Sequence, residues 1–161
     1  MISGQCRAAR ALLGITQAEL AEVAESGTKT IADFERGTKR DLHTITLRAL
    51  GNALEKAGIE FLDTEGSRPG VRLKKPLKTG QDRLITPDLC RAAREFLYIN
   101  QQQLADTSKV KKRTIADFER GMDRNFNESI LKAIRASLEK AGIEFIDANG
   151  GGPGVRLKKK K

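Results

Sequence analysis

The first forty residues place apolar and polar side chains with the period of an α-helix. Small and apolar residues recur three and four positions apart along Gly4–Leu13, which predicts a first helix with one apolar face. A second helix is predicted to begin at the capping box Thr16–Glu19 and to end near Ala24. A third is predicted over Thr28–Arg36, with Gly37 as its left-handed C-terminal cap.

The pattern changes after these three helices. Leucines at helical spacing predict a longer fourth helix that ends at Ala57 and Gly58. Beyond it, apolar residues alternate with polar ones on both sides of a glycine- and proline-rich connection at 65–70, which is typical of a β-hairpin. The alternating apolar residues are Ile59, Phe61, Val71 and Leu73.

The whole pattern occurs twice. The octapeptide Thr30–Gly37 recurs as Thr114–Gly121, and the same offset of 84 residues aligns Cys6–Lys75 with Cys90–Lys159 without a gap. A unit of this length exceeds solenoid repeats of about 20–50 residues. The sequence therefore predicts a duplicated small domain: domain 1 at 1–75, a linker at 76–85, and domain 2 at 86–161, which ends in a basic tail.

The second copy repeats the helix and hairpin signals with different residues. Thr86 followed by Pro87 restarts the helical pattern, and Asn100–Gln103 replaces the capping box. The second hairpin is predicted at Ile143–Asp147 and Val155–Lys158. Because short hairpins leave edge strands that need partners, we expect the two copies to form an intramolecular pseudo-dimer, with the four alternating apolar residues and their equivalents as the seam of a continuous sheet.

Composition narrows the class of function. The net charge is +9 at pH 7, which favours a polyanionic partner. No apolar run is long enough to cross a membrane, and no signal peptide is evident, so we expect a cytoplasmic, nucleoid-associated protein. Cys6 and Cys90 are equivalent positions and are interpreted as small core residues. A single histidine and no repeated nucleophile–base set argue against an enzyme, and we expect no cofactor, metal or small-molecule ligand.

Two short helices separated by a tight turn within a small helical domain define a helix-turn-helix. Three segments of the first copy, Arg7–Leu13, Gln17–Ala24 and Thr30–Gly37, carry a resemblance to the lambda-repressor-like (XRE) family of bacterial DNA-binding regulators. The resemblance implies a mainly α fold with two tandem lambda-repressor-like helix-turn-helix domains, each followed by a short C-terminal β-hairpin. It also implies a sequence-specific transcriptional regulator that binds double-stranded DNA, with both recognition helices in the major groove of adjacent half-sites.

The resemblance also implies which residues meet DNA. Glutamines at the start of the second helix of each copy would contact the DNA backbone or a base edge. Outward-facing residues at the third helix would read bases, and an arginine beyond it would hold a phosphate. The residues are Gln17, Thr28, Lys29, Asp33 and Arg40 in the first copy, and Gln101, Lys111, Lys112, Arg113, Asp117 and Arg124 in the second. Two buried ion pairs, Arg10–Glu35 and Arg94–Glu119, would be structural.

The family usually places glycine in the turn and serine or threonine at the start of the third helix, and the two copies depart from this pattern in different ways. Copy one has Glu25-Ser26-Gly27 in the turn, and copy two has Lys109-Val110-Lys111. The segment 22–37 holds two basic and four acidic side chains, whereas 106–121 holds five basic and three acidic. The acidic first copy keeps open a second interpretation, a protein-binding module that sequesters another regulator as an antiactivator or antitoxin would. An exposed, solvated basic turn is the alternative for Lys111–Arg113, and the sequence leaves homodimerisation of the whole chain open.

Overall fold

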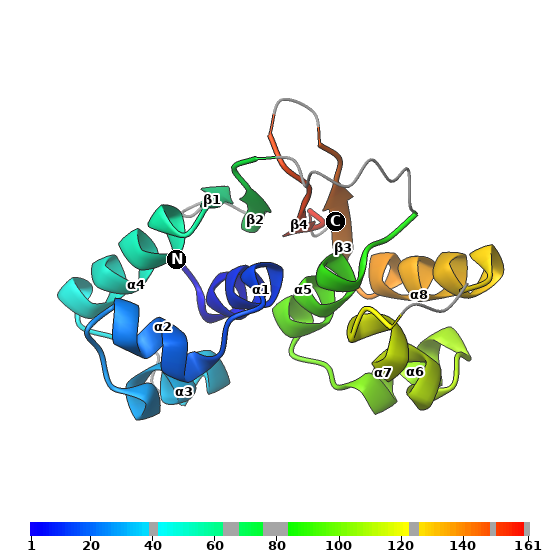
Figure 1. Cartoon of the computed structure of the whole chain (residues 1–161), viewed down its shortest axis with the longest axis horizontal. Coiled ribbons are helices and arrows are strands. Elements are labelled where there is room, and N and C mark those ends of the chain that lie inside the picture. Colours follow the sequence, from blue (N-terminus) through cyan, green and yellow to red (C-terminus); the bar gives the residue numbers. More distant parts are fainter. Residues whose placement is uncertain (39–41, 63–67, 76–83, 123–125, 149–150, 160–161) are drawn as a thin grey trace.

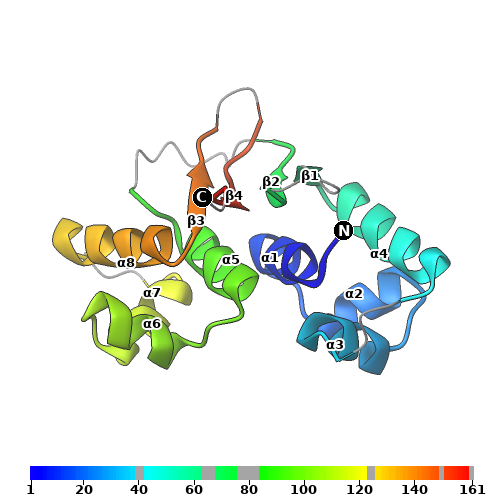
Figure 2. The ribbon, with the colours of Figure 1, turned by 180° about the vertical axis from the view of Figure 1, so that it is seen from behind.

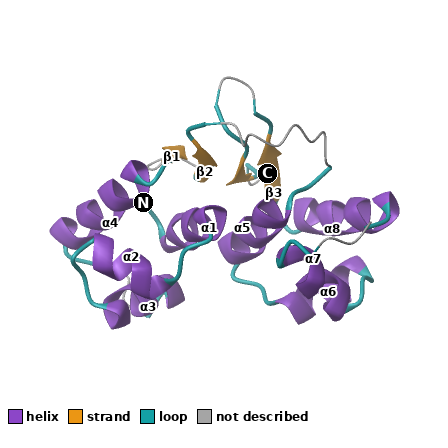
Figure 3. Ribbon diagram, viewed as in Figure 1, coloured by secondary structure: helices purple, strands orange, loops and turns teal. Residues whose placement is uncertain are grey.

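The computed structural model describes residues 1–38, 42–62, 68–75, 84–122, 126–148 and 151–159, and these form eight helices and four strands (Figures 1 and 3). The first copy contains α1 (Ser3–Leu13), α2 (Gln17–Val23), α3 (Thr28–Arg36), α4 (Thr44–Lys56), β1 (Ile59–Leu62) and β2 (Gly70–Leu73). The second contains α5 (Pro87–Leu97), α6 (Gln101–Ser108), α7 (Lys112–Glu119), α8 (Glu128–Lys140), β3 (Ile143–Ile146) and β4 (Gly154–Leu157). The predicted fold class, mainly α with a hairpin after each helical unit, is confirmed.

The helix ends follow from local chemistry. At α2, the Thr16 hydroxyl accepts from the Glu19 amide at 3.2 Å, and the Glu19 carboxylate accepts from the Thr16 amide at 2.6 Å, so the predicted capping box is present. Asn100 and Gln103 make the same reciprocal pair at α6. Gly37 caps α3 with a left-handed φ of 74°, also as predicted.

The turn between the two helices of each helix-turn-helix holds an unusual backbone conformation. Glu25 and Lys109, which are equivalent positions, adopt φ values of 48° and 59°. This left-handed region favours glycine because a Cβ crowds the neighbouring carbonyl there. The residues that replace the expected turn glycine therefore take over its backbone conformation at an energetic cost.

One four-stranded antiparallel sheet joins the two copies, in the order β1-β2-β4-β3. The central strands pair with Val71 opposite Val155, and Gly70 lies opposite Arg156. Glycine at 154 permits this close pairing, because a Cβ there would lie 2.3 Å from the Val71 carbonyl oxygen. The predicted continuous sheet is confirmed, but the seam contains only β2 and β4. Ile59 and Phe61 and their equivalents Ile143 and Phe145 were wrongly expected there, because they lie on the outer strands β1 and β3.

The copies also meet through helices. α1 packs along α5 between the sheet and the helix-turn-helix elements, as both views of the ribbon show (Figures 1 and 2). Gly4 allows the approach, since a Cβ there would lie 3.1 Å from the Phe96 ring. Buried Cys6 and Cys90 are free thiols in one hydrophobic core that runs through both copies. Residues 76–83 of the predicted linker lie outside the described residues, and Ile85 at its end is fully buried.

Candidate nucleic-acid interface

The helix-turn-helix elements of both copies lie on the side of the molecule away from the sheet. Figure 1 shows α2 and α3 below α1, and α6 and α7 below α5, while α4 and α8 form the two outer ends. Ile31 and Phe34 turn the inner face of α3 into the core, and Ile115 and Phe118 do the same for α7. The exposed residues of these helices are Thr28, Lys29 and Arg36 on α3 and Lys112 and Arg113 on α7.

A buried ion pair fixes each of these helices to the first helix of its copy. Arg10 donates from Nε and Nη2 to the two carboxylate oxygens of Glu35, both at 2.8 Å, and Arg94 binds Glu119 at 2.9 and 3.1 Å. Only 2% of the Glu35 side chain and 3% of the Glu119 side chain are exposed. Both predicted pairs are confirmed as buried and bidentate, a geometry that restrains orientation as well as distance.

The ion pairs alter the chemistry of their neighbours. Burial alone would lower the pKa of Arg10, but hydrogen bonds and the charge of Glu35 raise it above its ordinary value. Burial, reinforced by Glu35, raises the pKa of the Cys6 thiol, whose Sγ lies 3.6 Å from the Glu35 carboxylate. Cys90 beside Glu119 is affected in the same way. Both thiols therefore stay protonated at neutral pH, as expected of core residues.

The glutamines predicted to meet DNA are held by the same carboxylates. Gln17 donates from its side-chain amide to Glu35 at 2.6 Å, and Gln101 donates to Glu119 at 2.8 Å. Each glutamine is half-buried at the first residue of its helix. The carboxylate on the third helix of each copy thus links that helix to the first and second helices.

The basic residues predicted for the recognition helices are exposed at their N-terminal ends. Gly27 is the N-cap of α3, followed by exposed Thr28 and Lys29. Lys111 takes the N-cap position of α7 without a side-chain cap, followed by exposed Lys112 and Arg113. Arg40 and Arg124, the predicted phosphate contacts, lie outside the described residues.

The two aspartates are less accessible than expected. Asp33 is 19% exposed, with Lys29 at 3.6 Å and Arg36 at 3.3 Å. Asp117 is only 6% exposed in its side chain, so the expectation that it faces outward is wrong. Asp117 belongs to a buried run with Phe118 and Glu119 on α7, and the guanidinium nitrogens of Arg113 and Arg120 lie 4.0 and 3.7 Å from its carboxylate.

The sequence interpretation overlooked Arg36 and Arg120 as candidate contacts. Arg36 is the last residue of α3 and Arg120 directly follows α7, and 54% and 65% of their side chains are exposed. Their spacing, three residues after an aspartate on a predicted helix, could have indicated that they are held in place.

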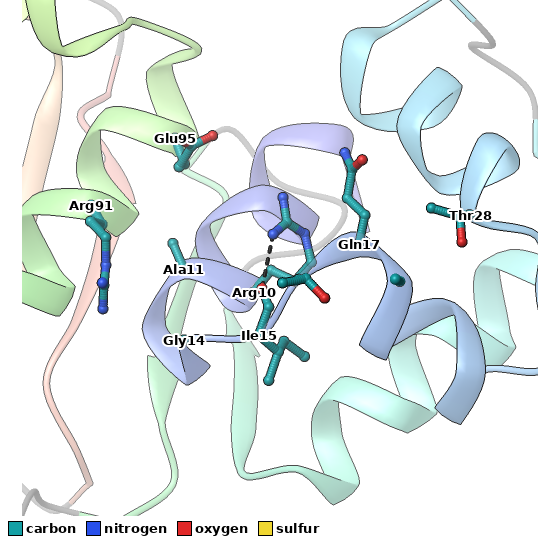
Figure 4. A pocket seen from close by; sticks show the side chains of 10 residues that line it. Arg10, Ala11, Gly14, Ile15, Gln17, Thr28, Arg91 and Glu95 are labelled. Atoms are coloured by element: carbon teal, nitrogen blue, oxygen red, sulfur yellow. Dashed lines mark hydrogen bonds between the residues drawn. The ribbon is translucent and has the colours of Figure 1, made fainter. Parts of the chain in front are cut away.

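A hollow lies between the N-terminal ends of the second and third helix in each copy. In copy two it has a volume of about 430 Å³ and is lined by Arg94, Asn100, Gln101, Gln102 and Lys112. In copy one it has a volume of about 600 Å³ and includes the equivalent residues Arg10, Thr16, Gln17, Ala18 and Thr28. The copy-one hollow extends to Arg91 and Glu95 of α5, so it also faces the junction of the copies (Figure 4). The two helix N-termini beside each hollow favour an anion, whereas the charge of the arginine that lines it is already paired with a buried glutamate.

A sequence-family comparison agrees with this geometry. Residues 7–61 match the helix-turn-helix family, a span that runs from within α1 into β1. Residues 7–61 form a helix-turn-helix domain of that family. The helix-turn-helix of copy two repeats the same elements in the same order at the 84-residue offset. No curated protein matches the chain.

Metal-binding clusters and membrane-spanning helices are both absent from the described part of the chain. Its histidine, cysteine, aspartate and glutamate side chains do not form a group of three or more that could hold a metal ion. Within the same residues, no helix has the length and hydropathy needed to cross a bilayer.

Proposed function

We propose that this chain is a non-enzymatic transcriptional regulator that binds double-stranded DNA sequence-specifically, with α3 and α7 in the major groove at adjacent half-sites. The single observation that carries the proposal is the presentation of two helix-turn-helix elements on one side of one polypeptide, joined through a common sheet and core. In this proposal residues 1–75 and 86–161 are two domains that act as the two halves of a dimer.

The packing order of the helices supports two half-sites. α3 packs on α1, α1 on α5, and α5 on α7. Since packed helix axes lie about 8–10 Å apart at closest approach, three such steps place α3 and α7 on the order of 30 Å apart. One turn of B-DNA is about 34 Å, a difference that exposed arginine and lysine side chains can span.

The start of α7 supports an anionic partner. Lys111, Lys112 and Arg113 stand at the positive end of a helix dipole, where each cation costs about 0.3–1 kcal/mol. A DNA phosphate beside them would reverse the sign of this effect. In our proposal these residues supply phosphate contacts and guanine readout, while Asp117 holds Arg113 and Arg120 rather than meeting a base itself.

Copy one would use Thr28 and Lys29 at the equivalent positions, with Asp33 available to accept from a cytosine amino group. Gln17 and Gln101, held by the buried carboxylates, would contact the backbone at the edge of each half-site.

The test is direct. Genomic fragments bound by the purified chain are sequenced, and a recovered site is titrated at several salt concentrations against a scrambled duplex of equal length. We expect a strong preference for the recovered site and a slope of log K against log salt of about −0.9 per phosphate contact. Equal, salt-independent binding to both duplexes would contradict the proposal.

One observation favours a protein partner as the second candidate function. Val23 and Ile45 of copy one are 68% and 81% exposed, whereas their equivalents in copy two are the polar residues Thr107 and Ser129. An antiactivator-like module would bind another regulator through such residues. If the chain acts in this way, replacing Val23 and Ile45 with the Thr and Ser of copy two should abolish binding to the other regulator and leave the DNA titration unchanged.

A further inference from the structure

One arginine crosses between the two copies. Arg7 on α1 donates from Nε to the Glu95 carbonyl at 2.7 Å and from Nη2 to the Phe96 carbonyl at 3.4 Å, both in the last turn of α5. Its guanidinium also lies 4.6 Å from the centre of the Tyr98 ring, which caps α5. The third nitrogen, Nη1, donates to the carbonyl of Glu35 in α3.

The guanidinium of Arg7 thus connects three helices: α1, which carries it, and α3 and α5, whose carbonyls accept its hydrogen bonds. The last-turn carbonyls of a helix have no partner within the helix and form the negative end of its dipole, so a cation there is favourable. Arg7 is only 7% exposed, and a planar guanidinium with directed donors permits little freedom once it is buried. The recognition helix of copy one is thereby tied to the first helix of copy two.

The equivalent arginine of copy two does not cross. Arg91 donates to the Glu119 carbonyl of its own copy at 3.0 Å, and its other terminal nitrogen binds Asp88 within α5. Two sequence differences account for this. Asp88 corresponds to Gly4 and Tyr98 to Gly14, so copy one offers Arg7 no acid on its own helix and offers Arg91 no ring across the junction.

We propose that Arg7 is a positioning residue, a one-sided clamp that fixes the placement of the two helix-turn-helix units and so sets the half-site spacing that the chain accepts. At the sheet, the copies are joined by three residue pairs of β2 and β4 and by backbone hydrogen bonds of Leu73 with Pro153 and Gly152 and of Leu157 with Pro69. This seam lies on one side of the junction, so a rocking motion about β2 and β4 would change the separation of α3 and α7. Arg7 opposes that motion from the helical side of the junction. The spacing role rests on the proposed function, whereas the clamp itself does not.

The clamp is tested without DNA. Spin labels are attached at Glu22→Cys and Asp106→Cys, exposed equivalent positions on α2 and α6, while buried Cys6 and Cys90 stay unlabelled. Pulsed electron spin resonance should give a narrow distance distribution for the parent protein and for the matched control Arg91→Ala. Arg7→Ala should broaden that distribution at least about twofold, because a buried fork with several partners is lost.

Two further variants protect the test against misfolding. Arg7→Lys keeps the charge but loses the fork, and Tyr98→Gly removes the ring while suiting the left-handed backbone at φ 57°. Both should broaden the distribution less than Arg7→Ala does. A distribution as narrow as the parent's in folded Arg7→Ala, or an equal broadening in Arg91→Ala, would overturn the clamp.

The spacing role is tested with duplexes in which the half-sites of a recovered operator are moved apart or together by one and two base pairs. Each added or removed base pair rotates one half-site by about 34° relative to the other, so a rigid chain can no longer bind both at once. Its affinity for the duplex should then fall by about 10²-fold or more. Parent and Arg91→Ala should show that loss, and Arg7→Ala should bind the whole series within about threefold. A broadened distance distribution with unchanged spacing preference would overturn the spacing role while leaving the proposed function standing. Failure of the parent protein to bind any duplex would contradict the proposed function and the spacing role, while the spin-label distances still decide the clamp.

Discussion

The identical segments Thr30–Gly37 and Thr114–Gly121 hold most of α3 and α7, but the two helices differ at their N-terminal ends. In both, the same buried ion pair and the same glutamine fix the helix to its copy with nearly equal distances. Ahead of the shared sequence, Gly27–Lys29 carries one positive charge and Lys111–Arg113 carries three. The duplicated frame thus holds each helix in place through contacts that do not involve the residues at its N-terminal end, so the two ends can differ without displacing the helices.

The largest effect should come from the shared frame. Glu119→Ala leaves the largely buried Arg94 with only Glu95, 3.0 Å away, as an acidic partner, which costs about 3–5 kcal/mol. Glu35→Ala should cost at least as much, because position 11, the equivalent of Glu95, is alanine and gives Arg10 no second acid. Thermal unfolding of both variants, with the exposed Glu22→Ala as control, measures this. A melting temperature equal to that of the parent in either variant would refute the structural role of that pair.

The next largest effect should be a difference between the two copies in their contribution to DNA affinity. Arg113→Ala is expected to weaken operator binding by about 1–3 kcal/mol, the usual value of a bidentate base contact, and the matched Lys29→Ala should cost less. Copy two then supplies more of the affinity, and copy one mainly supplies register and discrimination. Equilibrium titration at one fixed salt concentration compares the two, and a greater loss for Lys29→Ala would reverse the ranking.

A smaller effect concerns the seam. Arg68 of copy one and Arg156 both bind Glu144 of copy two, and a hydrogen bond from Arg156, with the charges of both arginines, lowers the pKa of Glu144. Arg68→Ala should cost at most about 1 kcal/mol at neutral pH, because both partners are one-third exposed.

A lowered folded pKa also fixes the pH window of that contribution. The stabilisation is present above the unfolded glutamate pKa of about 4.3 and is lost as the pH falls through the lower folded value. Urea unfolding of the parent and Arg68→Ala should therefore differ at pH 7 and converge in acid. A difference that persists unchanged in acid would exclude Glu144 as the cause.

The smallest effect lies in the turns. Lys109→Gly relieves a left-handed backbone and should stabilise the protein by up to about 1 kcal/mol, with Glu25→Gly acting similarly in copy one. Denaturant unfolding of each variant and of the parent protein measures both changes. Destabilisation by the two turn variants would show that Glu25 and Lys109 make contacts that outweigh backbone strain.

Much of this structure could be predicted from local sequence signals. The capping box at Thr16, the glycine stop at Gly37 and the alternation around Val71 each specify their own element, and the repeat carried those predictions to the second copy. The family resemblance then supplied the Arg10–Glu35 pair, which periodicity alone does not reveal.

What could not be predicted depends on tertiary packing. Asp117 is buried together with Phe118 and Glu119, whereas the identical residue of copy one, Asp33, is more exposed, so the local sequence alone does not decide its burial. The exclusion of Ile59 from the seam depends on which edge of each hairpin meets the other. The crossing of Arg7 was signalled only by the departures from the repeat at positions 4 and 14, and its meaning required α1 and α5 side by side.

The central claim, that one chain places both recognition helices on adjacent half-sites, is tested most directly by hydroxyl-radical footprinting of a recovered operator at a stoichiometry of one chain per duplex. The account predicts two protected blocks on the same face of the DNA, about one helical turn of roughly 34 Å apart. It also predicts that Arg113→Ala weakens one block more than Lys29→Ala weakens the other. A single protected block, or two blocks that appear only when a second chain binds, would contradict it.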